Sequence, residues 1–257
     1  MIDVALTPAQ LRDCDVAVVI DVLRATTTIT WALGAGYEEV HCVATLPDAR
    51  ALAGADRVLA GERDCVAPPG FDQGNSPREA ALVAARELVL ASTNGTPAIL
   101  AATGSAPLVI VASVINLEAV ARVVAGAAAA GLAQLVCAGS EGAVALEDVY
   151  LAGRLSQRLG GERSDAARTA EALARRYPDP ASALRSGAHA TRLREAGLES
   201  DIADCALESE LTVVGQVCAV SERAAVVCAG DRVQTSGRTG VRSRARHTAA
   251  VILAAAV

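Results

Sequence analysis

The sequence predicts an α/β protein with a layered α/β/α architecture built from βαβ units. Three observations favour this class. Short apolar runs rich in β-branched residues alternate along the chain with longer helix-compatible stretches. Glycine and other turn-forming residues separate the two kinds of segment. The runs are apolar almost throughout, which is typical of buried strands. At 257 residues the chain can bury a substantial core, as one large domain or as two small ones.

The first predicted unit is a βαβ pattern that continues into a further helix and strand. In order, it has a strand at 15–20, a helix at 27–33, a strand at 39–43, a helix at 47–52 and a strand at 57–60. Gly34-Ala35-Gly36 ends the first helix, and Pro47 suits the first turn of the second. Gly61-Glu62-Arg63 follows the last strand, and strand ends are where α/β proteins keep their chemistry.

Residues 68–77 predict a loop, because they are too rich in turn formers for a helix or a strand. This loop contains Asp72 and the only phenylalanine of the chain. Asn75 and Ser76 precede Pro77, which is typical of an N-cap followed by proline at the first helical position. The helix is predicted over 78–87. From these residues alone, a surface turn with a simple cap and a functional loop are both open.

A second segment repeats the pattern of the first unit. With an offset of 70 positions, Arg24-Ala25-Thr26-Thr27 falls on Asn94-Gly95-Thr96-Pro97, and a strand at 88–91 precedes the second segment. This weak match suggests two similar lobes. Gly95 permits close approach of the backbone, and the hydroxyls of Thr93 and Thr96 can bond oxyanions. A generic N-capped helix start is the alternative.

The remaining predicted elements lead into a charged, helical region. They are strands at 108–112 and 132–137, a helix that runs through Ala129, a helix from Leu146, helices at 164–176, 182–187 and 190–196, and ordered segments at 201–205 and 211–214. We therefore expect an α/β domain over 1–215 and a C-terminal extension over 216–257. The stretch 230–246 is rich in arginine, glycine, serine and threonine, which predicts that the extension is partly flexible.

Composition excludes several classes of function. The chain has no lysine, which excludes Schiff-base chemistry, a P-loop lysine and a lysine-stabilised aspartyl-phosphate site. A net charge of -6 with 2% aromatic residues argues against nucleic-acid binding. No segment matches a signal peptide or a membrane span. We expect a soluble, cytoplasmic protein with a small-molecule partner, and the sequence leaves a homo-oligomer open.

The cysteines predict no redox framework. There are seven, scattered without a CxxC pair, at positions 14, 42, 65, 137, 205, 218 and 228. We expect reduced, mostly buried thiols. None of them begins a Cys-x5-Arg loop, so a thiol-phosphate intermediate is not expected.

The stretch 18–29 carries the strongest indication of a site. A β-branched run ends in Asp21, and then come Arg24 and the hydroxyls of Thr26 and Thr27 before a helical pattern. Helix N-termini favour phosphate or sulfonate, and Arg24 adds a planar, permanently charged fork. Asp21 would repel such an anion unless a divalent cation bridges the two. The alternative is that Asp21 merely caps the helix.

Two further places offer groups for chemistry. Glu147 and Asp148 fall in the first turn of a helix, where acids either stabilise the helix dipole or position a metal or a water. His189 is one of three histidines and opens another helix. It is a candidate proton donor, although a solvated helix histidine is the commoner explanation.

Taken together, several segments resemble the 2-phosphosulfolactate phosphatase family. They are VVIDVLRATTTI at 18–29, GER at 61–63, GFDQGNSP at 70–77, TNGT at 93–96, CAG at 137–139, LEDVYLAG at 146–153 and SGAH at 186–189. The motifs keep one linear order across 15–214. The resemblance implies a fold peculiar to that family and a Mg²⁺-dependent phosphatase that releases phosphate from 2-phospho-3-sulfolactate, a step toward coenzyme M.

The residues in the matching motifs fit that chemistry. Mg²⁺ prefers carboxylates and phosphate oxygens, and phosphoryl transfer needs charge neutralisation and alignment. The expected catalytic residues are Asp21, Arg24, Glu62, Arg63, Asp72, Glu147 and Asp148, with Asp21, Glu62 and Asp72 as metal ligands. The expected substrate-binding residues are Thr26, Thr27, Asn75, Ser76, Thr93, Asn94, Gly95 and Thr96.

Three alternatives to this function are open. The first is a non-catalytic protein that binds a small phosphorylated anion. The second is a phosphatase for a different phosphorylated hydroxy acid. The third is an aspartyl-phosphate phosphatase with Asp21 as nucleophile, but that class needs an acid at position 23, which is Leu23, and a lysine.

Overall fold

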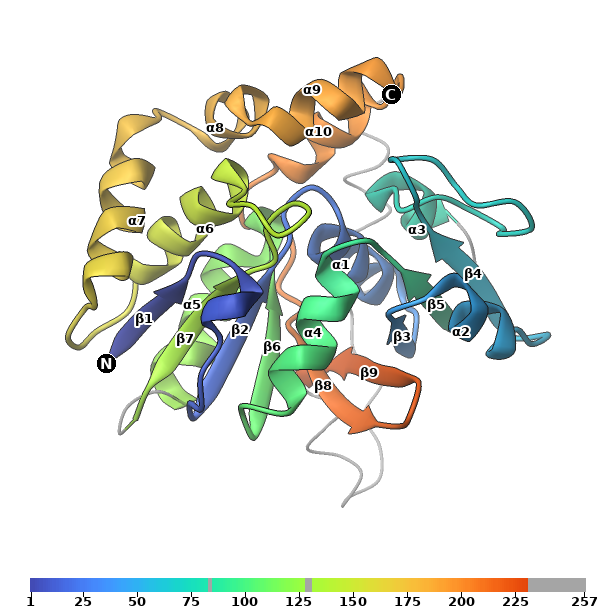
Figure 1. Cartoon of the computed structure of the whole chain (residues 1–257), viewed down its shortest axis with the longest axis horizontal. Helices are drawn as coiled ribbons and strands as arrows, with labels where there is room; N and C mark the ends of the chain where they lie inside the picture. The colour runs from blue at the N-terminus through green and yellow to red at the C-terminus, as the bar shows by residue number, and fades with distance from the viewer. Residues whose placement is uncertain (83–84, 128–130, 231–257) are drawn as a thin grey trace.

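The computed structural model describes residues 1–82, 85–127 and 131–230. In these ranges the chain forms an α/β protein around one mixed sheet of nine strands, in the order β1-β7-β2-β6-β8-β9-β3-β5-β4 (Figure 1). The strands are β1 (Ile2–Ala5), β2 (Val16–Ile20), β3 (Glu39–Val43), β4 (Arg57–Gly61), β5 (Glu87–Ala91), β6 (Leu108–Ala112), β7 (Ala133–Cys137), β8 (Gly215–Val220) and β9 (Ala224–Ala229).

The helices of the described ranges pack around this sheet. They are α1 (Ala25–Ala35), α2 (Leu46–Ala51), α3 (Pro77–Leu82), α4 (Gly95–Thr103), α5 (Leu117–Ala127), α6 (Leu146–Ser156), α7 (Asp165–Arg176), α8 (Pro180–Ser186), α9 (Ala188–Glu195) and α10 (Glu199–Cys205), with 3-10 turns at Pro8–Gln10 and Val114–Asn116. In Figure 1, α8, α9 and α10 lie together at one end of the molecule, above the carboxyl end of β2.

Parallel strands form two blocks, and a hairpin joins them. One block contains β1, β7, β2 and β6, and the other contains β3, β5 and β4. The hairpin β8–β9 pairs antiparallel with β6 on one side and with β3 on the other. Three antiparallel pairings therefore separate β6 from β3, yet the carboxyl ends of β2 and β5 come together, because Gly95, just after β5, lies against Asp21, just after β2.

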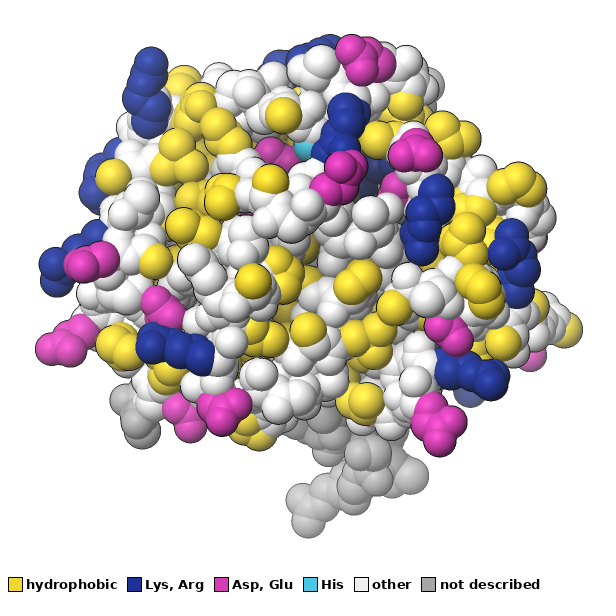
Figure 2. Space-filling model, viewed as in Figure 1, with side chains coloured by type: hydrophobic (Ala, Val, Ile, Leu, Met, Phe, Trp, Pro, Cys, Tyr) yellow, Lys and Arg dark blue, Asp and Glu magenta, His cyan; other side chains and the backbone are white. Residues whose placement is uncertain are grey.

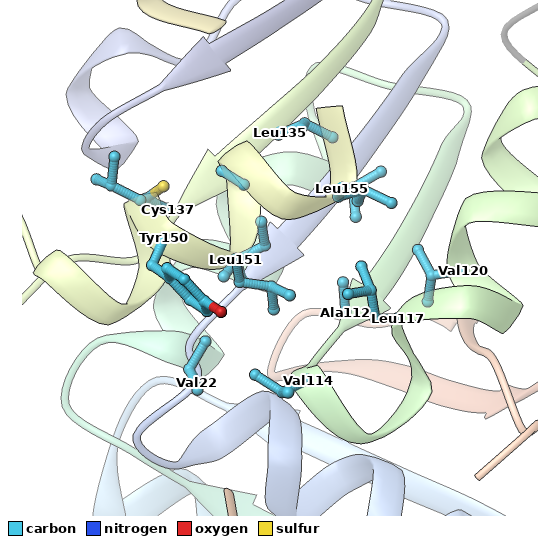
Figure 3. Packing of buried hydrophobic residues seen from close by; sticks show 14 of the residues in the cluster. Val22, Ala112, Val114, Leu117, Val120, Leu135, Cys137, Tyr150, Leu151 and Leu155 are labelled. Atoms are coloured by element: carbon cyan, nitrogen blue, oxygen red, sulfur yellow. The ribbon is translucent and has the colours of Figure 1, made fainter. Parts of the chain in front are cut away.

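Alternate residues of the central strands enter separate hydrophobic clusters. Val18 and Ile20 of β2 belong to a cluster with residues of α5 and α6. Ala17 and Val19 belong to another, which contains residues of α4. Successive side chains of a strand point to opposite faces, so helices cover both sides of β2. Figure 3 shows the first cluster, with α6 side chains packed beside those of β7 and α5. The predicted α/β class is confirmed.

The predicted C-terminal extension begins too early. Most of β8 and all of β9 come from 216–229, which belong to the predicted extension, yet they fill the centre of the sheet. Their strand structure depends on the open edges of β6 and β3, which a local pattern does not reveal. The predicted flexible tail lies outside the described residues from position 231 onward.

The hairpin also corrects the expectation that every cysteine is reduced. A disulfide joins Cys218 to Cys228, whose Cα atoms are 6.0 Å apart. The pairing of β8 with β9 brings the two residues together, and the sequence alone does not fix that register. The other five cysteines are free thiols, four of them buried. None of the helices in the described ranges has the length and apolar character that a membrane crossing needs.

Candidate active site

Four acidic residues gather where strands of both blocks end. Asp21 directly follows β2 and is buried, and Glu62 directly follows β4. Glu147 and Asp148 lie in the first turn of α6 and are also buried. The negative charges of Glu62 and Glu147 both act on the carboxyl of Asp21, and that of Asp21 acts on Asp148. The fold therefore unites acids that are far apart in the sequence.

Backbone N–H groups hold two of these carboxylates in place. Asp148 accepts from the N–H of Val22 at 2.9 Å through Oδ1 and from the N–H of Gly139 at 3.0 Å through Oδ2. Asp148 thus ties the ends of β2 and β7 together. Glu62 accepts from the N–H of Thr93 at 2.7 Å, and from Cys65 at 3.3 Å, which joins the ends of β4 and β5.

Burial and mutual repulsion raise the pKa values of the buried acids. The pKa of Asp21 rises to about 7, chiefly because burial disfavours its charge, and Glu62 and Glu147 add to the rise. Burial also raises the pKa of Glu147, and burial together with Asp21 and Glu147 raises the pKa of Asp148 well above its ordinary value. Burial and repulsion thus oppose the ionised forms of these acids, and a bound cation would favour them.

The guanidinium of Arg24 bonds to groups of the protein itself. Arg24 is buried, and its guanidinium donates to Asp201 of α10 at 2.7 Å and to the carbonyl oxygen of Cys65 at 2.9 Å. Asp201 also accepts from the hydroxyl of Ser76 at 2.8 Å. The hydroxyl of Ser76 therefore binds α10. Its carbonyl oxygen accepts from the N–H of Ala80 at 3.1 Å, as at an N-cap position, and α3 begins at Pro77 as predicted. Arg24 and Ser76 together fix α10 beside the site.

The hydroxyls of Thr26 and Thr27 shape the turn after β2. Thr26 donates to the carbonyl oxygen of Asp21 at 2.8 Å and accepts from the N–H of Asp21 at 3.0 Å. Thr27 donates to the carbonyl oxygen of Val22 at 2.8 Å. Both side chains are fully buried. Since their hydroxyl protons are already donated within the protein, these side chains hold the position of Asp21.

Thr96 plays the same part in the second block. It accepts from the N–H of Ser92 at 3.0 Å and donates to the carbonyl oxygen of Val43 at 2.7 Å. The predicted overlay of the two units places Thr96 on Thr26, and both close a strand-to-helix turn. Gly95 lies against Asp21 so closely that a side chain on Gly95 would collide with the carboxyl of Asp21. The two turns therefore meet at Asp21.

The rest of the second turn faces the loop after β7. Asn94 accepts from the N–H of Glu141 at 3.0 Å through Oδ1. The side chain of Thr93 is exposed, and only its backbone N–H is engaged, by Glu62. Thr93 is thus the one predicted hydroxyl of this turn with its side chain free to meet a ligand among the residues that the structure describes.

Two predicted catalytic residues, Asp72 and Arg63, bond to backbone groups outside the gathered acids. Asp72 accepts from the N–H of Leu59, midway along β4, at 2.7 Å, and its residue is exposed, so it is not among the gathered acids. The loop that contains Asp72 runs beside β4 as an edge strand would. The sequence of the loop does not predict this pairing with β4. Arg63 donates to the carbonyl oxygens of Glu62 and Ala44.

Asn75 is buried, and its side-chain oxygen makes no hydrogen bond in the described part of the chain. Its carbonyl oxygen accepts from Thr28 of α1 at 3.2 Å, so the backbone serves the packing of the loop. Asn75 is therefore placed in the interior against α1, where it supports the loop.

Helix α9 adds cationic and imidazole groups that face the acids. Burial lowers the pKa of His189 to about 4, and the positive charges of Arg192 and Arg24 contribute. The imidazole is neutral at neutral pH, so it does not supply a proton as an imidazolium in the free site. Glu147 contacts Gly187, at the start of α9. Figure 2 shows acidic and basic side chains around a partly visible histidine at this end of the molecule.

Two participants are absent from the sequence prediction. Arg192 forms an ion pair with Glu141 at 2.6 Å and a hydrogen bond with Ser140, which links α9 to the loop after β7. Arg192 lies three residues after His189, and that spacing places both on one side of a helix. The sequence therefore contains a signal for Arg192. The sequence around Asp201 does not indicate its contact with Arg24, because that contact depends on where α10 packs.

Comparison with known proteins agrees with this arrangement. The family model described as 2-phosphosulpholactate phosphatase matches residues 3–219. A protein of Thermus thermophilus named probable 2-phosphosulfolactate phosphatase is 46% identical over 198 residues, which cover 75% of this chain and 83% of that protein. Proteins of the same name from Deinococcus radiodurans and Thermotoga petrophila are 43% and 37% identical, over 73% and 81% of this chain and 81% and 91% of their own lengths. The chain therefore belongs to the 2-phosphosulfolactate phosphatase family.

Proposed function

We propose that this chain is a Mg²⁺-dependent phosphatase that hydrolyses 2-phospho-3-sulfolactate to 3-sulfolactate and phosphate. The observation that carries the proposal is the meeting of Asp21 and Glu62, at the ends of strands from both blocks, with Glu147 of α6. Arg192 and His189 lie beside them. A non-catalytic binder of anions has no use for buried acids that repel its ligand. A phosphatase with a divalent cation needs such acids, because they would hold the cation that lies between them and the phosphate.

The residues present fit Mg²⁺. Asp21 and Glu147 are the proposed ligands, since they are buried and offer carboxylate oxygens, the donors that Mg²⁺ prefers. Two carboxylates suffice, because Mg²⁺ in phosphate-handling sites keeps several waters and takes phosphate oxygens as further ligands. When bound, the ion would neutralise charge on the phosphoryl oxygens and lower the pKa of a bound water. Asp72, which lies at β4, is not a ligand in this proposal.

The protein groups divide into those that bind and those that position. Arg192, half-exposed beside the acids, is the proposed partner of the substrate's anionic groups, and the hydroxyl of Thr93 is a second donor. Asp148 holds the turn after β2 through its two backbone bonds. Glu62 fixes the turn before α4. The substrate's phosphate would also favour protonation of His189, because a nearby anion opposes the effects that lower its pKa.

Removal of metal is expected to abolish turnover. With 2-phospho-3-sulfolactate as substrate, EDTA should lower phosphate release by roughly a hundredfold or more, since a divalent cation contributes several kcal/mol to such reactions. Added Mg²⁺ should restore it. Full activity after complete removal of metal would refute the metal assignment. Binding of the ester without turnover at saturating Mg²⁺ would instead support a non-catalytic binder, and faster hydrolysis of an ester without the sulfonate would point to a different hydroxy acid.

Replacement of Arg192 with glutamine should raise KM by roughly tenfold or more, because a charge-assisted hydrogen bond to an anion contributes about 1.5–3 kcal/mol. Arg194→Gln on the same helix is the matched control, since the side-chain hydrogen bonds of Arg194 in the described structure go to Arg185 and Thr191. Glu141→Gln removes the ion pair but retains Arg192. If it raises KM as much as Arg192→Gln does, Arg192 acts only by anchoring the loop.

A further inference from the structure

A second group of chemistry-bearing side chains lies far from the acids of the active site. His41 is the third residue of β3, and Glu39 and Glu87 are the first residues of β3 and β5. They therefore lie at the amino ends of strands whose block contributes Glu62 and Thr93 at its carboxyl ends. Within the described ranges, these are the only three residues whose candidate ligand atoms all come within 4.8 Å of one another.

The geometry of this group is that of a metal site. Nε2 of His41 lies 3.0 Å from Oε2 of Glu87 and 3.3 Å from Oε2 of Glu39. Ligand atoms about 2.0–2.1 Å from a tetrahedral Zn²⁺ are about 3.3 Å apart, so the observed separations match the edges of such a site. Glu39 and Glu87 are direct partners across the parallel ladder, where like charges repel unless a cation lies between them.

The surroundings support one of the ligands. Arg57, which lies opposite Glu87 on β4, donates to Oε2 of Glu87 at 2.6 Å and to the carbonyl oxygen of Leu52 at 3.0 Å. Such an outer contact fixes the orientation of a ligating carboxylate. Burial raises the pKa of Glu87, but the bonds from Arg57 and His41 outweigh burial and leave that pKa below its ordinary value.

We propose that Glu39, His41 and Glu87 form a binding site for Zn²⁺, separate from the active site. One imidazole and two carboxylates, with a fourth position for water, suit Zn²⁺. Mg²⁺ fits poorly, because it prefers oxygen ligands in octahedral geometry. The side chain of His41 is 9% exposed and that of Glu39 is 43% exposed, so the ligands are held on the sheet while the ion can reach them from solvent. Arg57 keeps its bond to Glu87 as an outer contact.

The test is calorimetric titration of the full chain with Zn²⁺ in excess Mg²⁺, which occupies sites made of carboxylates alone. We expect the wild-type protein to bind one equivalent of Zn²⁺ more than His41→Gln does. Glu39→Gln should weaken that binding by on the order of tenfold or more, because it removes an anionic ligand. Glu38→Gln is the matched control: Glu38 is adjacent in sequence and pairs with Arg86 at 2.8 Å, so the variant should bind Zn²⁺ like the wild type.

Equal Zn²⁺ binding by the wild type, His41→Gln and Glu39→Gln would overturn the proposal and leave His41 as a bridge between two glutamates. Should His41→Gln fail to fold, Glu39→Gln decides alone, because its half-exposed side chain makes little packing contact. The measurement reads metal stoichiometry and affinity, not turnover, so its result does not depend on the proposed phosphatase activity.

Discussion

Replacement of Asp21 with asparagine is expected to lower kcat by roughly a hundredfold or more while the fold is retained. Asparagine preserves the shape of the side chain and can still accept from the backbone, but it removes the charge that would hold Mg²⁺ and orient the attacking group. Electrostatic and acid–base contributions are commonly of this size. The measurement is steady-state phosphate release at saturating Mg²⁺. Asp72→Asn is the matched control, because Asp72 contacts Leu59 on β4, and its kcat should stay near that of the wild type.

The same variant should be more stable than the wild type above neutral pH when metal is absent. The pKa of Asp21 is about 7 in the folded protein and near 3.8 in the unfolded chain. The folded state therefore binds more protons between these values, and stability falls as pH rises through the window. Asparagine removes this cost, which amounts to roughly 4 kcal/mol at about 1.4 kcal/mol for each pKa unit. Urea unfolding at pH 4 and pH 8 in EDTA measures it.

Together these readouts separate the two interpretations of Asp21. A residue that only caps α1 is replaced well by asparagine, so kcat would be unchanged and stability would shift by well under about 1 kcal/mol. Normal kcat in Asp21→Asn would therefore eliminate the catalytic assignment. Loss of activity together with gained stability at pH 8 would show a charge held in place for function.

Gly95→Ala is expected to be the most damaging small substitution at the site. A methyl group at position 95 would lie 2.6 Å from the Cβ of Ala25 and would also overlap the carboxyl of Asp21. Real Cβ atoms do not approach this closely, so α4 and the turn after β2 must move apart. Since a displacement of about 1 Å can cost a hundredfold in rate, we expect kcat to fall by at least that factor. Steady-state kinetics and circular dichroism are the measurements.

The control is Gly104→Ala, at the other end of the same helix. The added methyl there has only the carbonyl oxygen of Ala101 within 4 Å, at 3.6 Å, and the backbone of Gly104 is already helical. Activity and stability should stay near the wild type. If Gly95→Ala retained its activity, the close meeting of the two turns would have no bearing on Asp21.

Strongly local patterns predicted the strands well. The strands at 39–43 and 108–112 match β3 and β6 at both ends. For β6, an uninterrupted apolar run after Pro107 determines the limits. The helix predicted over 78–87 is too long, since β5 begins at Glu87. There the pairing of Glu87 with strands on both sides outweighs helical propensity. The sequence did not predict β1 or the hairpin β8–β9 for the same reason: these segments are strands because they pair with neighbouring strands, and their local sequence does not show it.

In the site, too, the sequence predicts the features that local patterns determine and not those that depend on distant parts of the chain. Asp21, Glu62, Glu147 and Asp148 follow strand ends or open a helix, and the fold gathers all four. Asp72 follows a turn-rich loop, and nothing in the sequence tells that the loop returns along β4. For Thr26 and Thr96 the sequence predicts polar contacts but not that their hydroxyls donate to backbone carbonyl oxygens.

The position of the hairpin has a consequence for how the protein is made. The two blocks do not pair with each other: β6 and β3 are complete by residue 112, yet both wait for residues 215–229 to cover their inner edges. During synthesis, a nascent chain therefore carries two uncovered strand edges until nearly the whole described length has left the ribosome. Uncovered edges invite pairing with other chains. The active site inherits this delay, since Asp21 and Gly95 belong to different blocks and the sheet that joins them closes last.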